Sequence, residues 1–407
     1  MLRFLTAGES HGQALVTIID GVPAGLSVDF DAVTADLRRR QGGYGRGRRM
    51  AIEADRAQAL SGVRHGVTTG APITLLIPNK DWENWQRTMH VEPEMPEGAT
   101  GQDRAAVTRP RPGHADLAGL VKYGHDDIRD VLERASARET AARVAVGAIA
   151  RQLLRAVGAD IVSHVVSIGS AAVAQPLTVT FAQVQAIPTD SALHCADAGV
   201  ERLMIAEIDR AREAGDTMGG SFEVIVHGLP PGLGSHVQWD RKLDGRLAQA
   251  LMSIQAIKAV GIGLGPGVAA LPGSRVHDEI LLGSDSEAAL LGVRRPTNNA
   301  GGLEGGITNG EDLRVTAYMK PISTLMKPLR SVDLTTMTES PAAIERSDVC
   351  AVPAAAVVGE AMVAIVLADA VLEKFGGDSV EELVANWQAF RVRTAARFNP
   401  RASMPTA

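Results

Sequence analysis

Two distant segments of the chain repeat one pattern, and this repeat limits the folds that the chain can adopt. Residues 7–27, AGESHGQALVTIIDGVPAGLS, align without a gap on residues 214–234, AGDTMGGSFEVIVHGLPPGLG. Each copy reads as a glycine-bounded loop, a strand and a Pro/Gly turn, followed by a helix. Since no linker-like stretch separates the copies, we expect two related halves packed as one unit. Within the loop, the main chemical difference is His11 against Met218.

The length and composition predict a globular, soluble protein. The chain has 407 residues, 45% of them hydrophobic, and a formal net charge of -6. Nowhere do about eighteen apolar residues run unbroken, and polar side chains interrupt the first dozen positions, so we expect a cytoplasmic protein without a membrane partner. The mild acidity argues against a nucleic-acid-binding surface. Cys195 and Cys350 are expected to be ordinary buried thiols, and no metal site is expected.

Hydrophobic periodicity and end signals predict the main elements. Strands are expected at 2–6 and 14–19. One helix is expected within residues 29–43, between an aspartate at the start and two glycines at the end. A second is expected at 136–158, beginning with a capping box. Two more are expected from about 240 to 261 and from about 353 to 376. The aperiodic, acidic segment 80–105 is expected to be a surface excursion, and residues 395–407 a flexible tail.

Six arginines in RRRQGGYGRGRRM, residues 38–50, concentrate positive charge in an acidic chain. Arg38 and Arg39 fall in the last turn of a predicted helix, where cations complement the helix dipole, and we expect them to be solvated. The last three arginines lie among glycines, where backbone can approach a ligand and guanidinium groups can hold phosphate or carboxylate. RNA would require more aromatic side chains than the single tyrosine present, so we expect a small anion.

Two histidines lie in polar, glycine-containing loops, His11 in GESHG and His114 in RPRPGHAD. Such positions suit proton exchange beside an anion, and neither histidine has metal-ligand spacing. In LERASARET, residues 132–140, Arg134, Ser136 and Arg138 stand at a helix start, where free N–H groups favour phosphate. A capping box with two surface arginines explains the same residues and remains an alternative.

Taken together, seven motifs resemble the chorismate synthase family, in order and approximate spacing, from Leu2 to about Phe375. They are AGESHG, RRRQGGYGRGRRM, RPGHAD, RASARETAARVA, GGLEGGITNG, MKPIST and RSDVCAVPAA. The resemblance implies an anti-1,4-elimination of phosphate and a hydrogen from 5-enolpyruvylshikimate 3-phosphate, giving chorismate in the shikimate pathway. It also implies a need for reduced FMN (FMNH2) without net redox change.

The family likeness further implies an α+β fold. The expected architecture is a β-α-β sandwich of two pseudo-symmetric halves, about 1–210 and 211–380, with helices between antiparallel sheets. It forms a single domain over 1–407 and is expected to assemble as a homotetramer.

The resemblance assigns roles to individual residues. It implies that His114 lies near the leaving phosphate and can protonate it, and that His11 keeps the reduced flavin correctly protonated. Asp348 matches the family's acidic residue beside the flavin N5, the atom thought to take the substrate proton. The expected substrate ligands are Arg40, Arg46, Arg49, Arg111 and Arg138, while Arg48 either contributes or is solvated. The expected FMN contacts are Arg134, Ala135, Ser136, Gln255, Ala256, Gly305, Lys320, Pro321, Ile322, Ser323, Thr324 and Arg346.

Two alternatives remain open at this level. A non-catalytic binding module, either a flavin store or an RNA binder, would give both histidines and Asp348 no required role. The flavin could be reduced by the chain itself with NADPH (the NADP coenzyme) or by an outside reductant. Because no reductase domain is appended, we expect an external flavin reductant.

Overall fold

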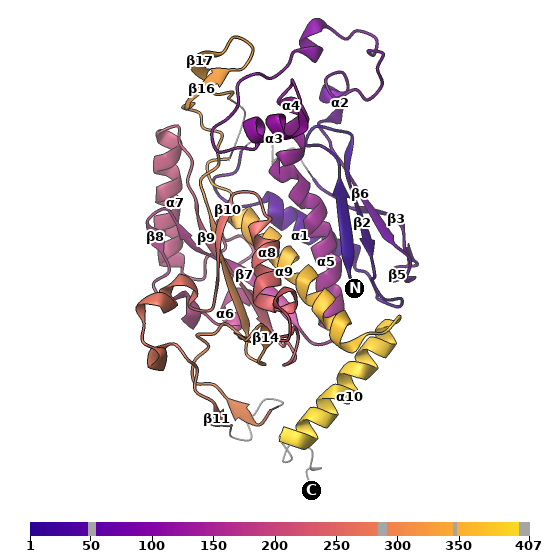
Figure 1. Ribbon diagram of the computed structural model, residues 1–407, viewed down its shortest axis with the longest axis vertical. Helices are drawn as coiled ribbons and strands as arrows, with labels where there is room; N and C mark the ends of the chain where they lie inside the picture. The colour runs from indigo at the N-terminus through magenta and orange to yellow at the C-terminus, as the bar shows by residue number, and fades with distance from the viewer. Residues whose placement is uncertain (48–53, 284–290, 345–347, 399–407) are drawn as a thin grey trace.

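Two antiparallel sheets and the helices that pack on them form the core of the computed structural model, which describes residues 1–47, 54–283, 291–344 and 348–398 (Figure 1). The first sheet has the order β1 (Arg3–Ala7), β2 (Ala14–Asp20), β6 (Ile73–Pro78), β3 (Gln58–Ser61). The second has the order β10 (Ile257–Ile262), β15 (Leu313–Met319), β9 (Gly220–His227), β7 (Asp160–Ile168), β8 (Ala171–Ala172). The predicted α+β class, with antiparallel sheets, is confirmed.

The described part of the chain also forms four short hairpins outside the two sheets. They are β4 (Val63–Arg64) with β5 (Val67–Thr68), β11 (Leu281–Leu282) with β12 (Val293–Arg294), β13 (Leu303–Glu304) with β14 (Ile307–Thr308), and β16 (Arg330–Asp333) with β17 (Thr338–Pro341).

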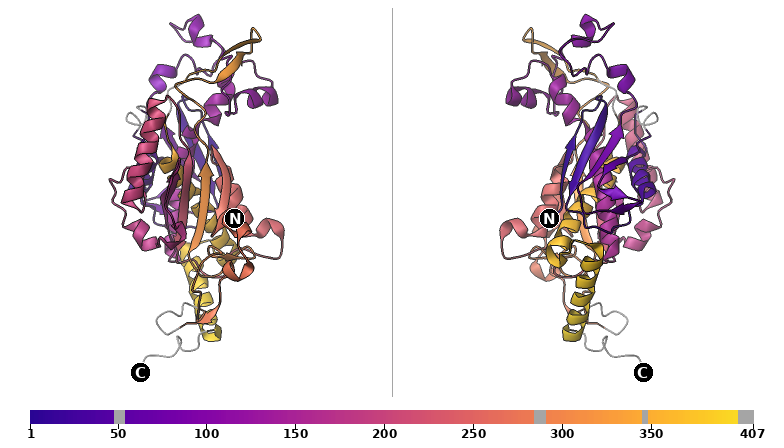
Figure 2. Two further views of the ribbon diagram at one scale, coloured as in Figure 1. Left: turned by 90° about the vertical axis from the view of Figure 1, so that its left-hand side faces the viewer. Right: turned by 90° about the vertical axis from the view of Figure 1, so that its right-hand side faces the viewer.

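The helices divide between the core and the two ends of the molecule. They are α1 (Phe30–Gln41), α2 (Trp82–Trp85), α3 (Asp116–Tyr123), α4 (Arg129–Ala135), α5 (Thr140–Ala156), α6 (Phe181–Gln185), α7 (Ala198–Glu213), α8 (Leu243–Met252), α9 (Val352–Phe375) and α10 (Val380–Phe398). Helix α5 packs on β2 and β6, α9 packs on β7 and β9, and the two helices pack on each other. Helices α2, α3 and α4 lie at the end of the molecule opposite α10 (Figure 2).

Helix α9 is long and apolar enough to cross a membrane, yet 89% of its most apolar window is buried inside the protein. Small residues permit this burial. A Cβ on Gly147 of α5 would lie 2.3 Å from the Cβ of Ala361, and one on Gly359 would lie 2.4 Å from the ring of Phe222. Glycine is therefore required where the two helices and the second sheet meet. Helix α9 is a core helix.

The two sheets share a strand order. Counted from β1, the first sheet runs β1-β2-β6-β3, and counted from β7 the second runs β7-β9-β15-β10. The repeat strands β2 and β9 hold the same place. A hairpin beside each sheet also makes matching contacts. The hydroxyl of Thr68 donates to the Pro23 carbonyl at 2.6 Å and accepts from the Leu26 N–H at 2.9 Å. Thr308 makes both hydrogen bonds to the corresponding proline and leucine, at 2.7 and 2.8 Å.

Several predicted boundaries are confirmed. The strands expected at 2–6 and 14–19 are β1 and β2, and the last predicted helix is α9. Helix α1 begins after Asp29, whose carboxylate accepts from two backbone N–H groups of the first turn, and ends at Gly42. Both cysteines are buried, and burial raises the pKa of each thiol to about 11.

Other boundaries were wrong. The third predicted helix ends at Met252 instead of 261, because the chain turns at Ala256 (φ +68°) and residues 257–262 pair with β15 as a strand. No capping box forms at Ser136. A 3₁₀ turn follows it, and helix α5 begins at Thr140. The carboxylate of Glu139 instead binds Thr6 and Arg143.

The structure also divides the chain differently from the predicted halves. Strand β7, at 160–168, belongs to the second sheet, so the change of sheet precedes residue 210. The repeat identified only β2 and β9, and β7 carries no recognisable copy of β1. At the other end, helix α10 continues to Phe398, which includes the first residues of the predicted tail.

A buried ion cluster joins the helices at the core. The guanidinium of Arg39 donates to Glu360 of α9 at 2.7 and 2.8 Å, so the prediction of a solvated Arg39 was wrong. Arg151 of α5 also pairs with Glu360, and the hydroxyl of Ser163 donates to it at 2.6 Å. Arg38 is exposed, as predicted. The helix dipole argument considered only the end of α1 and could not anticipate a carboxylate from α9.

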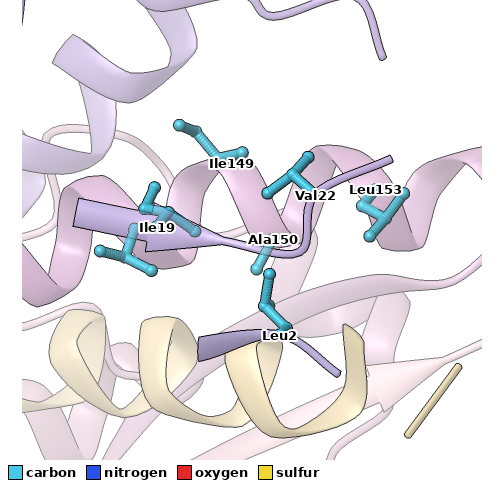
Figure 3. A pocket seen from close by; sticks show the side chains of 7 residues that line it. Leu2, Ile19, Val22, Ile149, Ala150 and Leu153 are labelled. Carbon is cyan, nitrogen blue, oxygen red and sulfur yellow. The ribbon is translucent and has the colours of Figure 1, made fainter. Parts of the chain in front are cut away.

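An apolar gap between β1–β2 and α5 belongs to this core (Figure 3). It is lined by Leu2, Ile19, Val22, Val146, Ile149, Ala150 and Leu153. Because its lining offers no polar side chain, it is unsuited to a phosphorylated ligand.

Candidate active site

Most of the predicted site residues lie near the ends of the strands, toward α3 and α4, in the upper part of Figure 1. The loop of the first repeat copy follows β1, and the predicted segment 320–324 follows β15. Sequence segments that are far apart therefore meet at one end of the molecule.

His11 is held by a buried carboxylate. Its backbone N–H donates to Oε2 of Glu133 at 2.9 Å, and its ring Nδ1 lies 3.0 and 2.9 Å from the two carboxylate oxygens. Glu133 belongs to α4, and its side chain is 2% exposed. An ionised carboxylate can only accept hydrogen bonds, so Nδ1 carries the hydrogen that faces it.

His114 has a carboxylate partner of its own. Its Nδ1 makes a short contact with Oδ1 of Asp116, at the start of α3. The guanidinium of Arg111 donates to both oxygens of Asp116, at 2.8 and 3.0 Å. Burial alone raises the pKa of Asp116, but hydrogen bonds from His114 and Arg111 more than offset it and hold that pKa well below its usual range. Asp116 is therefore ionised and orients the imidazole.

The predicted arginines form a second group. Arg138 donates to Asp55 at 2.6 Å and to Asn79 at 2.9 Å. Arg40 donates to Thr140 and to a backbone carbonyl, both at 2.8 Å, and shares Asp55 only at 4.0 Å. Its buried Nη1 has no hydrogen-bond acceptor among the described residues.

This arrangement leaves positive charge in excess around Arg40. Burial lowers the pKa of Arg40, and the neighbouring charges of Arg138 and Arg46 lower it further. Since a guanidinium stays protonated in proteins, the shift indicates a buried cation that lacks a sufficient counter-charge. An anion bound here would balance it.

Asp348 lies beside this group. Its Oδ2 is 2.7 Å from Nη1 of Arg46, and its Oδ1 accepts from the backbone N–H of Gly47 at 2.6 Å. The arginine loop and the carboxylate of Asp348 are thus in direct contact. Arg48, Arg49 and Arg346 lie outside the described residues.

The predicted cofactor contacts fall into three places. Arg134 donates to the backbone carbonyls of Thr6 and Gly8, at 2.9 and 3.1 Å, so it braces the first loop. Ser136, next to Ala135, hydrogen-bonds Ser10 at 3.2 Å. Ser136 and Ala135 therefore lie beside the loop that carries His11.

Residues 320–324 approach His114 from the other side. The ammonium of Lys320 donates to the Gly113 carbonyl, and Arg111 donates to Thr324 at 3.4 Å. Pro321, Ile322 and Ser323 lie between them. The backbone N–H of Lys320 donates to the Ala256 carbonyl at 2.9 Å, which brings Gln255 to the same segment. The buried Oε1 of Gln255 has no hydrogen-bond partner among the described residues.

Gly305 lies apart from these residues within the chain. It occupies the turn between β13 and β14 (φ +62°), whereas β15 runs between that hairpin and Lys320. The turn of the matching hairpin β4–β5 has His65 in a similar conformation (φ +50°). The left-handed conformation of this turn is enough to explain a glycine at position 305. A role of Gly305 in cofactor binding stays a prediction.

The second repeat copy positions the segments that carry Lys320 and Asp348. The hydroxyl of Thr217 donates to the Ile322 carbonyl at 2.7 Å, and the N–H of Met218 donates to the Val349 carbonyl at 2.8 Å. A Cβ on Gly219 would lie 2.4 Å from the Met319 carbonyl oxygen. The first copy positions a histidine, while the second supports neighbouring parts of the site.

Sequence reasoning missed the carboxylates that accompany the predicted cations and histidines, namely Glu133, Asp116 and Asp55. A signal existed for two of them, because Glu133 lies inside LERASARET and Asp116 follows His114 by two residues in RPRPGHAD. Asp55 had no signal of this kind. The assembled group offers two histidines with fixed Nδ1 hydrogens, an acidic residue and a buried cation, which suits proton transfer next to an anionic substrate.

Comparison with known proteins identifies the family. The family model described as chorismate synthase matches residues 2–372. A chorismate synthase of Desulforudis audaxviator (strain MP104C) is 57% identical over 396 residues, covering 97% of this chain and 99% of the relative. That of Geobacter sulfurreducens (strain ATCC 51573 / DSM 12127 / PCA) is 56% identical over 392 residues, covering 96% and 98%.

A solved structure described as a crystal structure of chorismate synthase has 42% sequence identity and a TM-score of 0.75, covering 97% of this chain and 98% of that one. A match at this level extends over both sheets and over the residues grouped above. These findings exclude the reading as an RNA-binding module. The chain belongs to the chorismate synthase family.

Proposed function

We propose that His11, His114, Asp348 and the arginines around Arg40 form the active site for the family's reaction. As a member of the family, the chain is a carbon–oxygen lyase of aromatic amino-acid biosynthesis that forms chorismate from a small-molecule substrate. The observation that carries the site is the pairing of each histidine with a buried carboxylate. Arg40 adds a buried cation whose charge is not balanced by its neighbours.

The arginines can balance the negative charge of the substrate. 5-Enolpyruvylshikimate 3-phosphate carries one phosphate and two carboxylates, and Arg40, Arg46, Arg111 and Arg138 are the described cations assigned to them. Arg40 contributes most clearly, because its buried Nη1 has no acceptor among the described residues. Arg111 is committed to Asp116 through two hydrogen bonds, so its proposed contribution to the substrate is through its positive charge.

His114 is proposed as the general acid for the departing phosphate. Asp116 holds the hydrogen on Nδ1, so the proton that can be transferred is the one on Nε2. When the carbon–oxygen bond breaks, that proton goes to the phosphate oxygen, and Asp116 stabilises the histidine while it is charged. The ion pair of Asp116 with Arg111 keeps the carboxylate ionised throughout.

Residues for reduced FMN are also present. The buried Oε1 of Gln255, which has no hydrogen-bond partner among the described residues, and the ammonium of Lys320 on the adjoining segment fit a ligand that carries a phosphate and hydrogen-bonding ring atoms. Lys320, Thr324, Gln255, Ala256 and Ser136 would hold it. When bound, reduced FMN supplies electron density to the allylic system and a place for the substrate proton, without net redox change. His11 would hold a proton on the cofactor's side, and Asp348 would lie where the substrate hydrogen leaves.

The wider architecture extends this proposal. The common strand order and the matching Thr68 and Thr308 contacts support two pseudo-symmetric halves around the helices. Leu5 and Ile18 pair across β1 and β2 on the outer face of the first sheet and are 74% and 42% exposed. That apolar face supports the proposed homotetramer. We also propose a cytoplasmic location and an external flavin reductant.

The test is direct. Purified protein should convert 5-enolpyruvylshikimate 3-phosphate to chorismate, followed by absorbance under anaerobic conditions, with reduced FMN but not without it. Folded, flavin-loaded protein that gives no turnover would overturn the proposal. Oxidation of NADPH by the protein plus FMN should be absent, and steady oxidation would show that the chain reduces its own flavin.

A further inference from the structure

The segment 80–105 reaches the ring of His11. Trp85, in helix α2, stacks on the imidazole with ring centroids 4.0 Å apart and planes 26° apart. The sequence predicted only a surface excursion, and most of the segment lies on the surface, but Trp85 of its first helix packs on a proposed catalytic residue. A stacked indole fixes the plane of the imidazole and shields one face from water.

Glu133 also restrains the imidazole of His11, through a contact with its Nδ1. Its carboxylate binds both the backbone N–H and Nδ1 of His11, so loop and ring are held by one side chain. The carbonyl of Glu133 also accepts from the N–H of Ser10 at 3.0 Å. The contact joins residues 122 positions apart, and the side chain of Glu133 within it is 2% exposed.

Both partners are themselves held in place. Nη1 of Arg129 lies 3.6 Å from Glu133, and its guanidinium carbon lies 5.4 Å from the centre of a Trp85 ring. The indole N–H of Trp85 donates to Asp81 at 3.0 Å. Asn79, just before α2, donates to the carbonyls of Glu9 and Gly12 at 3.2 and 2.7 Å. Helices α2 and α4 and the first loop therefore form one assembly around His11.

We propose that Glu133 and Trp85 are positioning residues for His11. Glu133 keeps the hydrogen on Nδ1, which makes Nε2 the nitrogen that gains and loses the proton, and Trp85 holds the ring in the orientation for that exchange. This inference rests on the proposed role of His11 in catalysis. It assigns a function to α2, the part of the chain for which the sequence offered none.

Glu133 and Trp85 should affect His11 in different ways, because only Glu133 carries a charge. Glu133 is an anion next to the ring, so it stabilises the imidazolium, while Trp85 is neutral and acts through contact. Among the described residues, the charged groups that contact the assembly include Arg129, which faces Glu133 from α4, and Asp81, which faces the indole from the start of α2. Arg134, also of α4, donates to the Gly8 carbonyl of the first loop. Removing the charge of Glu133 should therefore move the protonation of His11 to lower pH, whereas replacing Trp85 should alter mainly the ring's orientation.

The stack provides a direct measurement that needs neither flavin nor substrate. A protonated imidazole in contact with an indole quenches its fluorescence, and among the described residues Trp85 is the tryptophan stacked on a histidine. We expect the tryptophan emission of the full-length protein to fall as pH decreases, with a single step. The step should vanish in Trp85→Phe and in His11→Gln, and remain in Trp82→Phe, which alters the other tryptophan of α2. In Glu133→Gln its midpoint should move to lower pH, because the neutral amide no longer stabilises the imidazolium that it faces.

Turnover adds a second test. If His11 acts as the protonated form, Glu133→Gln should lose activity at alkaline pH first, while Asp130→Asn, an exposed carboxylate on the same helix, should match the parent. A uniform loss at every pH, with an unmoved fluorescence midpoint, would show that Glu133 is only structural and would overturn the proposal. Trp85→Phe should keep the parent's melting temperature and lower kcat more than KM.

The two experiments separate this proposal from the one on which it rests. A normal fluorescence step in the parent, moved in Glu133→Gln, supports the positioning of His11 even if His11→Gln turns over normally, in which case the catalytic role fails alone. A step that is unchanged in Trp85→Phe contradicts the stack itself. Circular dichroism of each variant identifies any that fails to fold, and Glu133→Asp, which keeps the charge, then replaces Glu133→Gln with an expected midpoint close to the parent's.

Discussion

Arg40 is the residue whose surroundings most clearly call for an anion. It is 4% exposed, makes hydrogen bonds to Thr140 and a backbone carbonyl, and keeps one buried nitrogen without an acceptor among the described residues. We expect Arg40→Lys to raise the KM for the substrate at least about tenfold, because a lost charge-assisted contact costs about 1.5–3 kcal/mol. Arg38→Lys, an exposed neighbour on the same helix, should leave the KM unchanged. Steady-state kinetics measure the KM of both variants. Equal effects of Arg40→Lys and Arg38→Lys would mean that the arginines act through their overall positive charge and do not form a defined binding site.

His114 and Asp116 test proton transfer at the same scale. His114→Ala should lower kcat on the order of a hundredfold, the usual contribution of a positioned general acid. A substrate with a better leaving group should recover part of the loss, because its departure needs less protonation. Asp116→Asn should lower kcat less than His114→Ala does. If good and poor leaving groups suffer alike, His114 is not the acid.

Residue type and loop context suggested candidate site residues in the sequence but did not indicate their partners. Arginines among glycines and histidines in polar loops identify candidate ligands, and the structure brings Arg46 to Asp348 and Arg111 to His114. The contact between His11 and Glu133 spans 122 positions, and no local pattern indicates which carboxylate will fold against which ring. For the same reason Arg39 was expected in solvent although α9 supplies it with Glu360.

At the scale of the elements, Glu360 links α9 to α1 and α5. Burial alone would raise its pKa, but Arg39 and Arg151 lower that pKa from 4.5 to about 2. Glu360→Gln should destabilise the protein at neutral pH by an amount on the order of 3 kcal/mol, because the buried Arg151 and the partly exposed Arg39 then share only the carboxylate of Asp36. The exposed Glu373→Gln on the same helix should have little effect.

The pH dependence of this effect has a defined sign. A carboxylate whose pKa is depressed in the folded state contributes stability above its unfolded pKa, and this contribution is lost as pH falls toward about 2. The difference in melting temperature between the parent and Glu360→Gln should therefore be largest near pH 7 and shrink below about pH 4.5. A difference that is constant with pH would mean that packing, not charge, stabilises the junction.

Element boundaries depended on contacts beyond the local sequence. Helix α1 was predicted well because Asp29 and Gly42 mark both of its ends. The third predicted helix continued too far because Ile257 and its neighbours fit a helical period until pairing with β15 makes them a strand. The start of α5 was placed too early since Glu139, which would have closed a capping box, has partners in β1 and one turn along α5.

The whole molecule reflects the repeat, although the sequence showed only part of it. Eight identities within 21 aligned positions predicted two related halves, whereas the matching positions of β1 and β7 and of the two hairpins became visible only in three dimensions. Strand sequences diverge freely while their buried faces remain apolar. The contacts of Thr68 and Thr308 persist because each satisfies a buried carbonyl and a buried N–H.

This correspondence predicts equal effects in the two halves. Thr68→Val and Thr308→Val keep the shape of the side chain but leave two backbone groups unsatisfied, at a cost of about 1–3 kcal/mol each. We expect thermal unfolding to show similar falls in melting temperature for both variants, and additive falls in the double variant. One tolerated and one disruptive substitution would contradict an equivalent role for the two hairpins.

The central claim is that the two repeat loops share a framework and that the first alone carries proton chemistry. The deciding measurement compares kcat for chorismate formation in His11→Met and Met218→Leu, with melting temperature and FMN affinity for both. Because the second loop already accommodates Met218, His11→Met should fold and bind FMN nearly as the parent does. Its kcat should nevertheless fall at least about tenfold, since methionine cannot carry a proton, while Met218→Leu keeps almost full activity. A His11→Met protein that unfolds, or that keeps the parent's kcat, would contradict this account.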